Sequence, residues 1–146
     1  RKAVFSYFCG NSYRKDNTKM YEAIIERIKE RLTGRELSAV IIPHISPDGD
    51  AAGSCSALWQ VLDKVGVQAQ LMTCDYIPDY LKWLKRIPDA ISFQNRPKEC
   101  KQWLHKADIL FMLDHNTVAR EGDLEPFVKE FEGEVIMIDH HPDQMM

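Results

Sequence analysis

Short runs of apolar residues, many of them β-branched, recur along the chain and alternate with stretches of helical periodicity. The apolar runs predict strands over residues 39–43, 67–72, 90–93, 109–113 and 135–138. Wholly apolar strands are typical of a parallel sheet with both faces covered, and strand-helix-strand order makes a right-handed βαβ unit. We therefore predict an α/β fold with a parallel sheet of about five strands, flanked by helices.

Between the strands, apolar residues recur every three or four positions. This spacing predicts helices over 19–32, 51–65, 97–106 and 118–132, with a short helix at 80–84. Gly122 and Pro126 are expected to interrupt the last of the long helices. Residues 1–18 have no clear period and receive no function, although 4–8 suit a short strand or an anchoring segment. Residues 19–146 are predicted to form one domain.

Metal-type side chains follow three of the predicted strands directly. The first strand leads into P-H-I-S-P-D-G-D-A-A-G-S, the fourth into L-D-H-N, and the last into I-D-H-H. Imidazole nitrogens and carboxylate oxygens are ligands for manganese, magnesium or zinc. Because the carboxyl ends of the strands form the ligand crevice of an open α/β sheet, we expect the three groups to converge on one site.

The first of these loops also has a purely structural interpretation. In it, Asp50 caps the following helix and Asp48 forms an Asx turn. His44 and His140 would then be histidines satisfied within the core. The recurrence of such residues at three strand ends favours a metal site over this alternative.

Composition narrows the class of protein. With 146 residues, 45% of them hydrophobic, and a formal net charge of −3, the chain suits one soluble domain. It has no apolar run of about 18 residues and no secretory pattern, so we expect a cytoplasmic protein without a membrane contact. The slightly negative net charge disfavours binding of nucleic acid through overall positive charge. Any nucleic-acid substrate should therefore be short, or be bound by a few local contacts. Four dispersed cysteines without a C-x-x-C pair are expected to be structural.

The three motifs, in this order, resemble those of the DHH phosphoesterase superfamily over residues 38–142. The form P-D-G-D-A-x-G-S looks most like the branch of bacterial bifunctional oligoribonucleases and 3′-phosphoadenosine 5′-phosphate phosphatases, the nanoRNases. The resemblance implies a Rossmann-like DHH domain with two manganese ions, or alternatively magnesium or cobalt. His44 and Asp48 would bind one ion, Asp50 and His140 the other. Asp114 would bridge the two.

The resemblance also implies catalytic residues. His141 matches the family histidine that faces the substrate phosphate, and Asp139 the acid that orients its neighbours; both have an alternative as turn or cap residues. Arg120 suits either a bidentate pair of hydrogen bonds to a phosphate or a solvent-exposed position on a helix. Asn116 is either part of the motif or an Asx-turn residue. His115 is expected to be incidental or to support Asp114.

The implied function is a two-metal phosphoesterase that hydrolyses short oligoribonucleotides and 3′-phosphoadenosine 5′-phosphate. Two closely spaced cations lower the pKa of a bridging water, so that hydroxide forms near neutral pH. Alternatives are a pyrophosphatase, an exopolyphosphatase, a cyclic-dinucleotide phosphodiesterase, or a non-catalytic metal- or nucleotide-binding module. The aromatic residues Tyr76, Tyr80 and Trp83 suit base stacking, but core and loop packing is favoured.

Two features of the resembled family are missing from the chain. A fourth acidic motif has no room after Asp139, and the smaller C-terminal substrate-binding domain is absent. We therefore expect the chain to be the N-terminal part of a longer protein. A homodimer is compatible with the sequence. As an isolated fragment it is expected to bind metal weakly and to turn over slowly or not at all.

Overall fold

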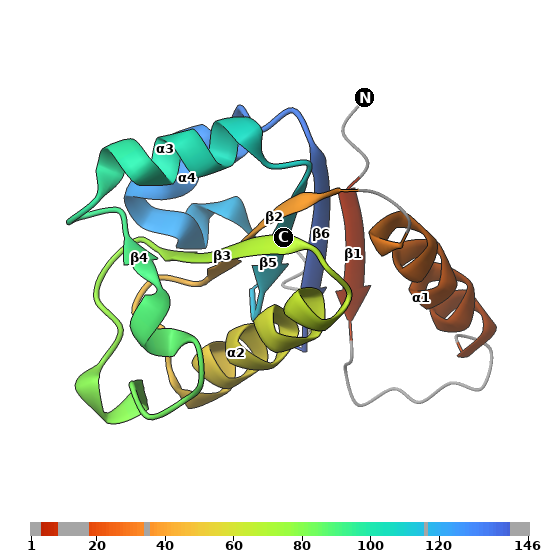
Figure 1. The fold of residues 1–146 in the computed structure, drawn as a ribbon, viewed down its shortest axis with the longest axis horizontal. Coiled ribbons are helices and arrows are strands. Elements are labelled where there is room, and N and C mark those ends of the chain that lie inside the picture. Colours follow the sequence, from red (N-terminus) through yellow and green to blue (C-terminus); the bar gives the residue numbers. More distant parts are fainter. Residues whose placement is uncertain (1–3, 9–17, 34–35, 116, 141–146) are drawn as a thin grey trace.

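A single parallel sheet organises the part of the chain that the computed structural model describes, residues 4–8, 18–33, 36–115 and 117–140 (Figure 1). Its six strands lie in the order β1-β6-β5-β2-β3-β4, and every neighbouring pair is parallel. This confirms the predicted fold class. The strand beyond the expected five is the N-terminal one, which pairs with β6. The strands are β1 (Val4–Phe8), β2 (Ser38–Pro43), β3 (Gln68–Thr73), β4 (Ile91–Ser92), β5 (Ile109–Leu113) and β6 (Glu134–Asp139).

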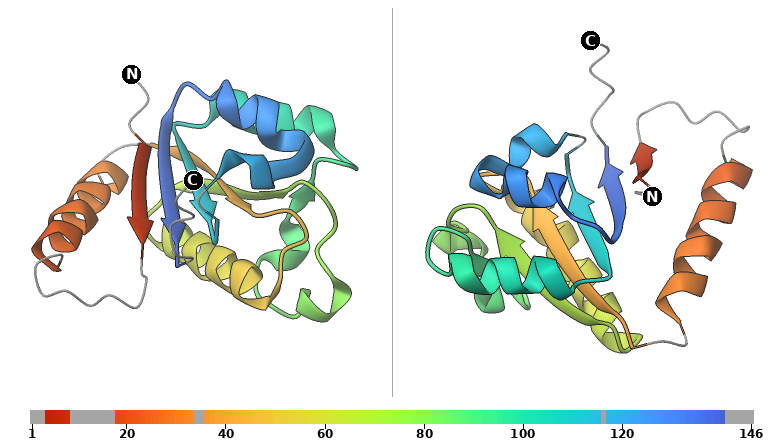
Figure 2. Two further views of the ribbon diagram at one scale, coloured as in Figure 1. Left: turned by 180° about the vertical axis from the view of Figure 1, so that it is seen from behind. Right: turned by 90° about the horizontal axis from the view of Figure 1, so that it is seen from above.

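Helices cover both faces of the sheet (Figures 1 and 2). The α-helices are α1 (Thr18–Leu32), α2 (Gly49–Lys64), α3 (Pro97–Lys106) and α4 (Glu125–Lys129). Three short 3-10 helices are η2 (Asp79–Leu81), η3 (Ile87–Asp89) and η4 (Val118–Leu124). α3 and α4 lie on one face and α2 on the other, whereas α1 lies beside the edge formed by β1.

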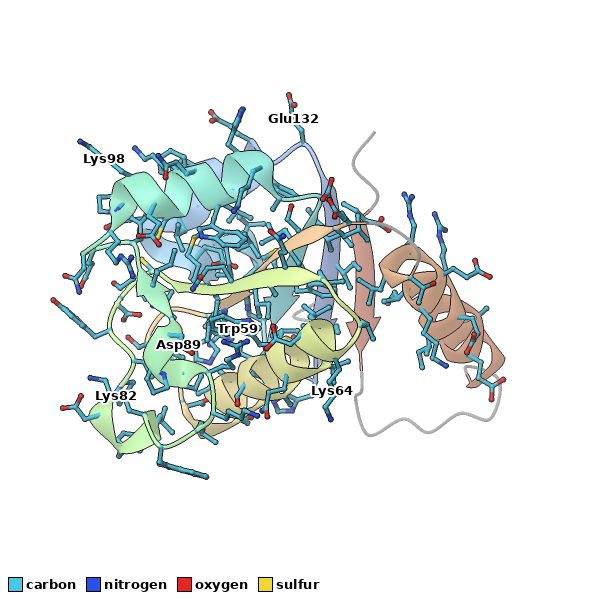
Figure 3. All side chains as sticks on the ribbon, viewed as in Figure 1. Trp59, Lys64, Lys82, Asp89, Lys98 and Glu132 are labelled. Carbon is cyan, nitrogen blue, oxygen red and sulfur yellow. The ribbon has the colours of Figure 1, made fainter. Side chains whose placement is uncertain are left out.

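The apolar strands are explained by two hydrophobic clusters, one on each face. Along β5, Phe111 belongs to the cluster beneath α2, and its neighbours Leu110 and Met112 belong to the cluster beneath α3 and α4. Successive side chains of a strand point to opposite faces, so a strand buried on both sides must be apolar throughout. Trp59 points inward from α2, whereas Lys98 on α3 lies on the exposed side (Figure 3).

The predicted helix over 118–132 is wrong in its extent. A kink lies within η4 at Gly122, which has φ 56° and ψ −130°, and this confirms the expected interruption at that glycine. Pro126, in contrast, does not interrupt a helix. It lies in the first turn of α4, where its missing N–H costs no hydrogen bond.

The packing interpretation of the aromatic residues is also wrong. Tyr76, Tyr80 and Trp83 are 65%, 68% and 79% exposed, so they contribute little to the core. They lie on the connection between β3 and β4, around the short helix η2. The hydroxyl group of Tyr76 donates to Oδ1 of Asn95 at 3.0 Å.

The cysteines within the described residues are consistent with a structural role. Cys55, Cys74 and Cys100 are free and buried. Burial raises the pKa of Cys100 to about 11 and the pKa of Cys55 further, which keeps both as neutral thiols. Cys9 lies outside the described residues. Where the structure is described, the chain contains no helix whose length and apolarity would let it span a bilayer.

Candidate metal centre

Three neighbouring strands present their carboxyl ends at one edge of the sheet. β5 lies between β2 and β6, and the register aligns Pro43 with Leu113 and Leu113 with Ile138. The residues that follow these positions therefore leave the sheet at the same level. This confirms that the three motifs converge, and it puts Asp114 in the middle.

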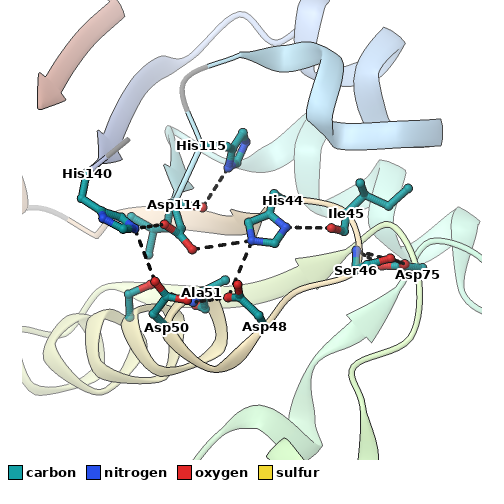
Figure 4. A network of polar contacts seen from close by, with 12 residues as sticks. His44, Ile45, Ser46, Asp48, Asp50, Ala51, Asp75, Asp114, His115 and His140 are labelled. Carbon is teal, nitrogen blue, oxygen red and sulfur yellow. Dashed lines mark hydrogen bonds and ion pairs between the residues drawn. The ribbon is translucent and has the colours of Figure 1, made fainter. Parts of the chain in front are cut away.

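Asp114 is buried and has a left-handed backbone conformation, with φ 63°. Its N–H donates to the carbonyl of Ile138 on β6 at 2.9 Å. A residue with a Cβ costs about 1–2 kcal/mol in this conformation, although aspartate tolerates it better than most. Its carboxylate oxygen Oδ2 lies 3.6 Å from Nε2 of His44, and Oδ1 lies 3.0 Å from Nε2 of His140 (Figure 4). One carboxylate thus faces two histidines.

His44 has the tautomer that a metal ligand needs. Its Nδ1–H donates to the carbonyl of Ile45 at 2.7 Å, because a carbonyl oxygen can only accept. The lone pair is then on Nε2, which faces the carboxylates of Asp48 at 3.8 Å and Asp114 at 3.6 Å. This arrangement favours a ligand over a histidine that is satisfied within the core.

The start of α2 supplies two more carboxylates. Asp48 caps the helix by accepting from the N–H of Ala51 at 3.2 Å, and Asp50 lies in the first turn. The cap is therefore Asp48 and not Asp50, contrary to the structural interpretation of this loop. A hydrogen bond with Asp50, followed by the Ala51 amide and the charge of His44, lowers the pKa of Asp48. Asp50 itself lies 3.3 Å from Nε2 of His140.

These five side chains form two groups that share one member. His44, Asp48 and Asp114 make the first group, and Asp50, Asp114 and His140 the second; within each, the ligand atoms lie within 4.8 Å of one another. Three carboxylates so close together repel one another unless cations or protons intervene. Mixed oxygen and imidazole donors fit divalent transition ions such as Mn²⁺. The residues present therefore fit two ions with a shared carboxylate.

A shallow cavity of about 170 Å³ opens beside the second group. Its lining is Asp50, Ser54, Leu113, Asp114, Ile138, Asp139 and His140. Ligand sites for whole small molecules usually measure about 300–1,000 Å³. The cavity therefore has room for a phosphoryl group but not for a complete nucleotide.

The remaining predicted residues have different outcomes. Asp139 is the buried last residue of β6 and lines the cavity. Arg120 lies half-buried in η4, where its carbonyl accepts from the N–H of Ile45, and the role of its guanidinium stays a prediction. His141 and Asn116 lie outside the described residues. Ser54, which lies in the second turn of α2, donates its hydroxyl hydrogen to the carbonyl of Ala51 at 2.9 Å.

Sequence reasoning missed the residues that hold the ligand loops. Asp75 accepts from the N–H of Ser46 at 3.0 Å and from its hydroxyl at 2.8 Å, which fixes the loop after His44. The available signal was its position two residues after the end of β3, close to a strand end like the other acids. Glu121 is fully buried against His115, and nothing in the apparently amphipathic pattern of 118–132 marked it. Burial raises the pKa of Glu121, and the contact with His115 opposes that shift.

Comparison with known proteins identifies the family and supports the fold. Residues 38–146 match the model of the DHH family, N-terminal domain. The crystal structure of an exopolyphosphatase-related protein from Bacteroides fragilis is similar, with a TM-score of 0.78 and 30% sequence identity. The match covers 84% of this chain and 36% of that protein, so the chain spans well under half of its length. No curated protein matches the chain.

Proposed function

Because the chain belongs to the DHH family, through the N-terminal domain that residues 38–146 match, we propose that it is the metal-binding part of a two-metal phosphoesterase. One observation carries the proposal. The two carboxylate oxygens of Asp114 face different histidines, His44 and His140, as a bridging ligand between two ions requires. We propose manganese as the native metal, because mixed carboxylate and imidazole donors suit it.

The protein's own residues would divide the work in the following way. His44 and Asp48 would hold one ion, Asp50 and His140 would hold the other, and Asp114 would be shared between them. Two ions held in this way would supply positive charge for the phosphoryl oxygens. They would also lower the pKa of a bound water to near neutrality, so that hydroxide forms. Without cations this acidic edge would repel a phosphate, so the side chains are more useful as metal ligands than as direct phosphate contacts.

We propose that the residues at and after the end of β6 serve the substrate phosphate. Asp139 lines the cavity beside Asp50 and His140, where a phosphoryl group fits, and it is proposed to orient its neighbours. His141 follows in the chain and is proposed to face the phosphate. Arg120 is proposed to donate a forked pair of hydrogen bonds to a second phosphate oxygen.

For the substrate we propose short oligoribonucleotides and 3′-phosphoadenosine 5′-phosphate. The P-D-G-D-A-A-G-S form of the first motif supports this choice. The cavity has room only for the phosphoryl group, so the nucleoside part of such a substrate would have to contact protein beyond these residues. An exopolyphosphatase is the second candidate, and the similarity to an exopolyphosphatase-related protein favours it.

The test uses the full-length protein with Mn²⁺. We would compare mononucleotide release from a short RNA with phosphate release from 3′-phosphoadenosine 5′-phosphate, pyrophosphate and polyphosphate, with Asp114→Asn as the inactive control. Cleavage of RNA and of the bisphosphorylated nucleotide is expected. Exclusive cleavage of polyphosphate would replace the proposed substrates with the second candidate. No metal-dependent cleavage of any of the four would contradict the phosphoesterase itself.

A further inference from the structure

A buried polar pair lies immediately beside Asp114. His115 and Glu121 are both fully buried, and Nε2 of His115 contacts Oε1 of Glu121. The other ring nitrogen, Nδ1, donates to the carbonyl of Leu113 at 2.8 Å. Apolar residues of similar volume usually stabilise a core as well as a buried polar pair does. The pair is therefore better explained by the geometry that it imposes than by the stability of the core.

Hydrogen bonds hold the backbone on both sides of Asp114. The ring of His115 holds the carbonyl of Leu113, and the carbonyl of Ile138 holds the N–H of Asp114. Between these two contacts the chain takes the left-handed conformation at Asp114. Because the direction of a side chain follows from the backbone that carries it, the contacts fix where the carboxylate points.

The segment that carries Glu121 also contacts the other ligand loop. The carbonyl of Arg120 accepts from the N–H of Ile45 at 2.8 Å, directly after His44. At Gly122 an added Cβ would lie 2.7 Å from Sγ of Cys74 and 3.0 Å from Cδ1 of Ile45. η4 is thus packed closely against the loop after β2, so a single segment holds both loops in register.

We propose that Glu121 is a positioning residue of the metal centre. Acting through the ring of His115, it holds Asp114 in the turn that aims one carboxylate at both ion positions, and η4 keeps that turn aligned with His44. The inference rests on the proposed two-metal function. It adds to it a residue that contacts neither ion.

The experiment separates positioning from folding with a double variant. Replacing both His115 and Glu121 with leucine keeps an apolar core of similar volume, so the thermal midpoint should stay near that of the wild type or rise. Mn²⁺ titrations of the full-length protein, followed by calorimetry and by the paramagnetic resonance signal of a coupled ion pair, measure the centre itself. The double variant is expected to weaken Mn²⁺ binding by about 10–100-fold and to lose the coupled signal.

Two single variants complete the design. Glu121→Gln keeps a hydrogen-bond partner for the histidine ring and should retain most of the affinity, whereas Glu121→Ala should not. Val128→Ala is the matched control, because it opens a cavity in the hydrophobic cluster beneath α3 and α4, and that cluster includes none of the five candidate ligands. It should lower the thermal midpoint and leave Mn²⁺ binding unchanged.

The outcomes are distinguishable. Wild-type affinity and a wild-type coupled signal in the folded double variant would overturn the positioning role and leave the two-metal function intact. Equal losses of affinity in Glu121→Ala and Val128→Ala would also overturn it, since both would then act through stability. A wild-type protein that binds no Mn²⁺ would overturn the proposed function and this inference together.

Discussion

The two halves of the candidate metal centre share Asp114 but differ in their surroundings. In the first half, the side chains of His44 and the shared Asp114 are 8% and 6% exposed, whereas that of Asp48 is 61% exposed. In the second half, the side chains of Asp50 and His140 are 63% and 57% exposed. The first half is further held by Ile45, Asp75 and the backbone of η4, whereas the second faces the cavity.

This difference indicates which half the fold prepares in advance. A buried histidine with a fixed tautomer loses little freedom when an ion binds, so the half around His44 should bind first and more tightly. The half around His140 faces the cavity, through which water or a substrate would reach an ion held there. Each group offers three protein ligands, fewer than the six that Mn²⁺ prefers in oxygen-rich sites, so the remainder must come from elsewhere.

The largest expected effect comes from removing what the halves share. In Asp114→Asn the amide retains the size of the side chain and tolerates the left-handed backbone, but it cannot neutralise two cations. Both ions should be lost, and metal-dependent turnover should fall by more than about 100-fold, beyond the loss typical of an outer-shell substitution. A Mn²⁺ titration and a phosphate-release assay measure this, with Asp79→Asn on the exposed helix η2 as control. Unchanged Mn²⁺ binding by Asp114→Asn would contradict the proposal that Asp114 bridges two ions.

A smaller effect should separate the two halves. Asp50→Asn removes a carboxylate only from the half around His140, so the stoichiometry of Mn²⁺ should drop from two to one. The remaining ion should bind with nearly wild-type affinity, because the contacts of His44 are untouched. Calorimetric stoichiometry provides the measurement. Simultaneous loss of both ions would show that the halves are not independent.

The metal-free protein offers a comparison in stability. His44→Ala empties a buried position and should cost about 1–3 kcal/mol, whereas His140→Ala, at an exposed position, should stay within about 0.5 kcal/mol. Urea unfolding of both variants in the presence of a chelator measures the difference. Equal costs would contradict the contrast between the buried His44 and the exposed His140.

The smallest effect concerns the cap of α2 and its pH dependence. The pKa of Asp48 is lowered below its ordinary value of 3.8, so its ionised form stabilises the metal-free fold above pH 3.8. This contribution is lost as the pH falls through the lowered pKa. The difference in stability between wild type and Asp48→Ala should be about 0.5 kcal/mol near neutral pH, at the low end for a cap, and should shrink below pH 3.8. A difference independent of pH would exclude this origin.

Much of the fold and the ligand set could be predicted from local pattern. The wholly apolar runs that became β2, β5 and β6 indicated a parallel sheet, because a strand buried on both faces leaves no polar position. Metal-type residues directly after each run then had to meet at one edge, since parallel strands end on the same side. His44, Asp114 and His140 were found in this way, and the order of the motifs indicated the family.

Other features depended on contacts between residues far apart in the chain. The aim of the Asp114 carboxylate follows from a backbone angle that Ile138 and His115 hold. The burial of Glu121, the anchoring of Ser46 by Asp75 and the exposure of Trp83 have no local signature either. Periodicity reports which side of an element is apolar, but burial and side-chain direction are set by whatever packs against that element. The chain's order of residues therefore specified the ligands, and the packing of distant segments specified their unequal surroundings.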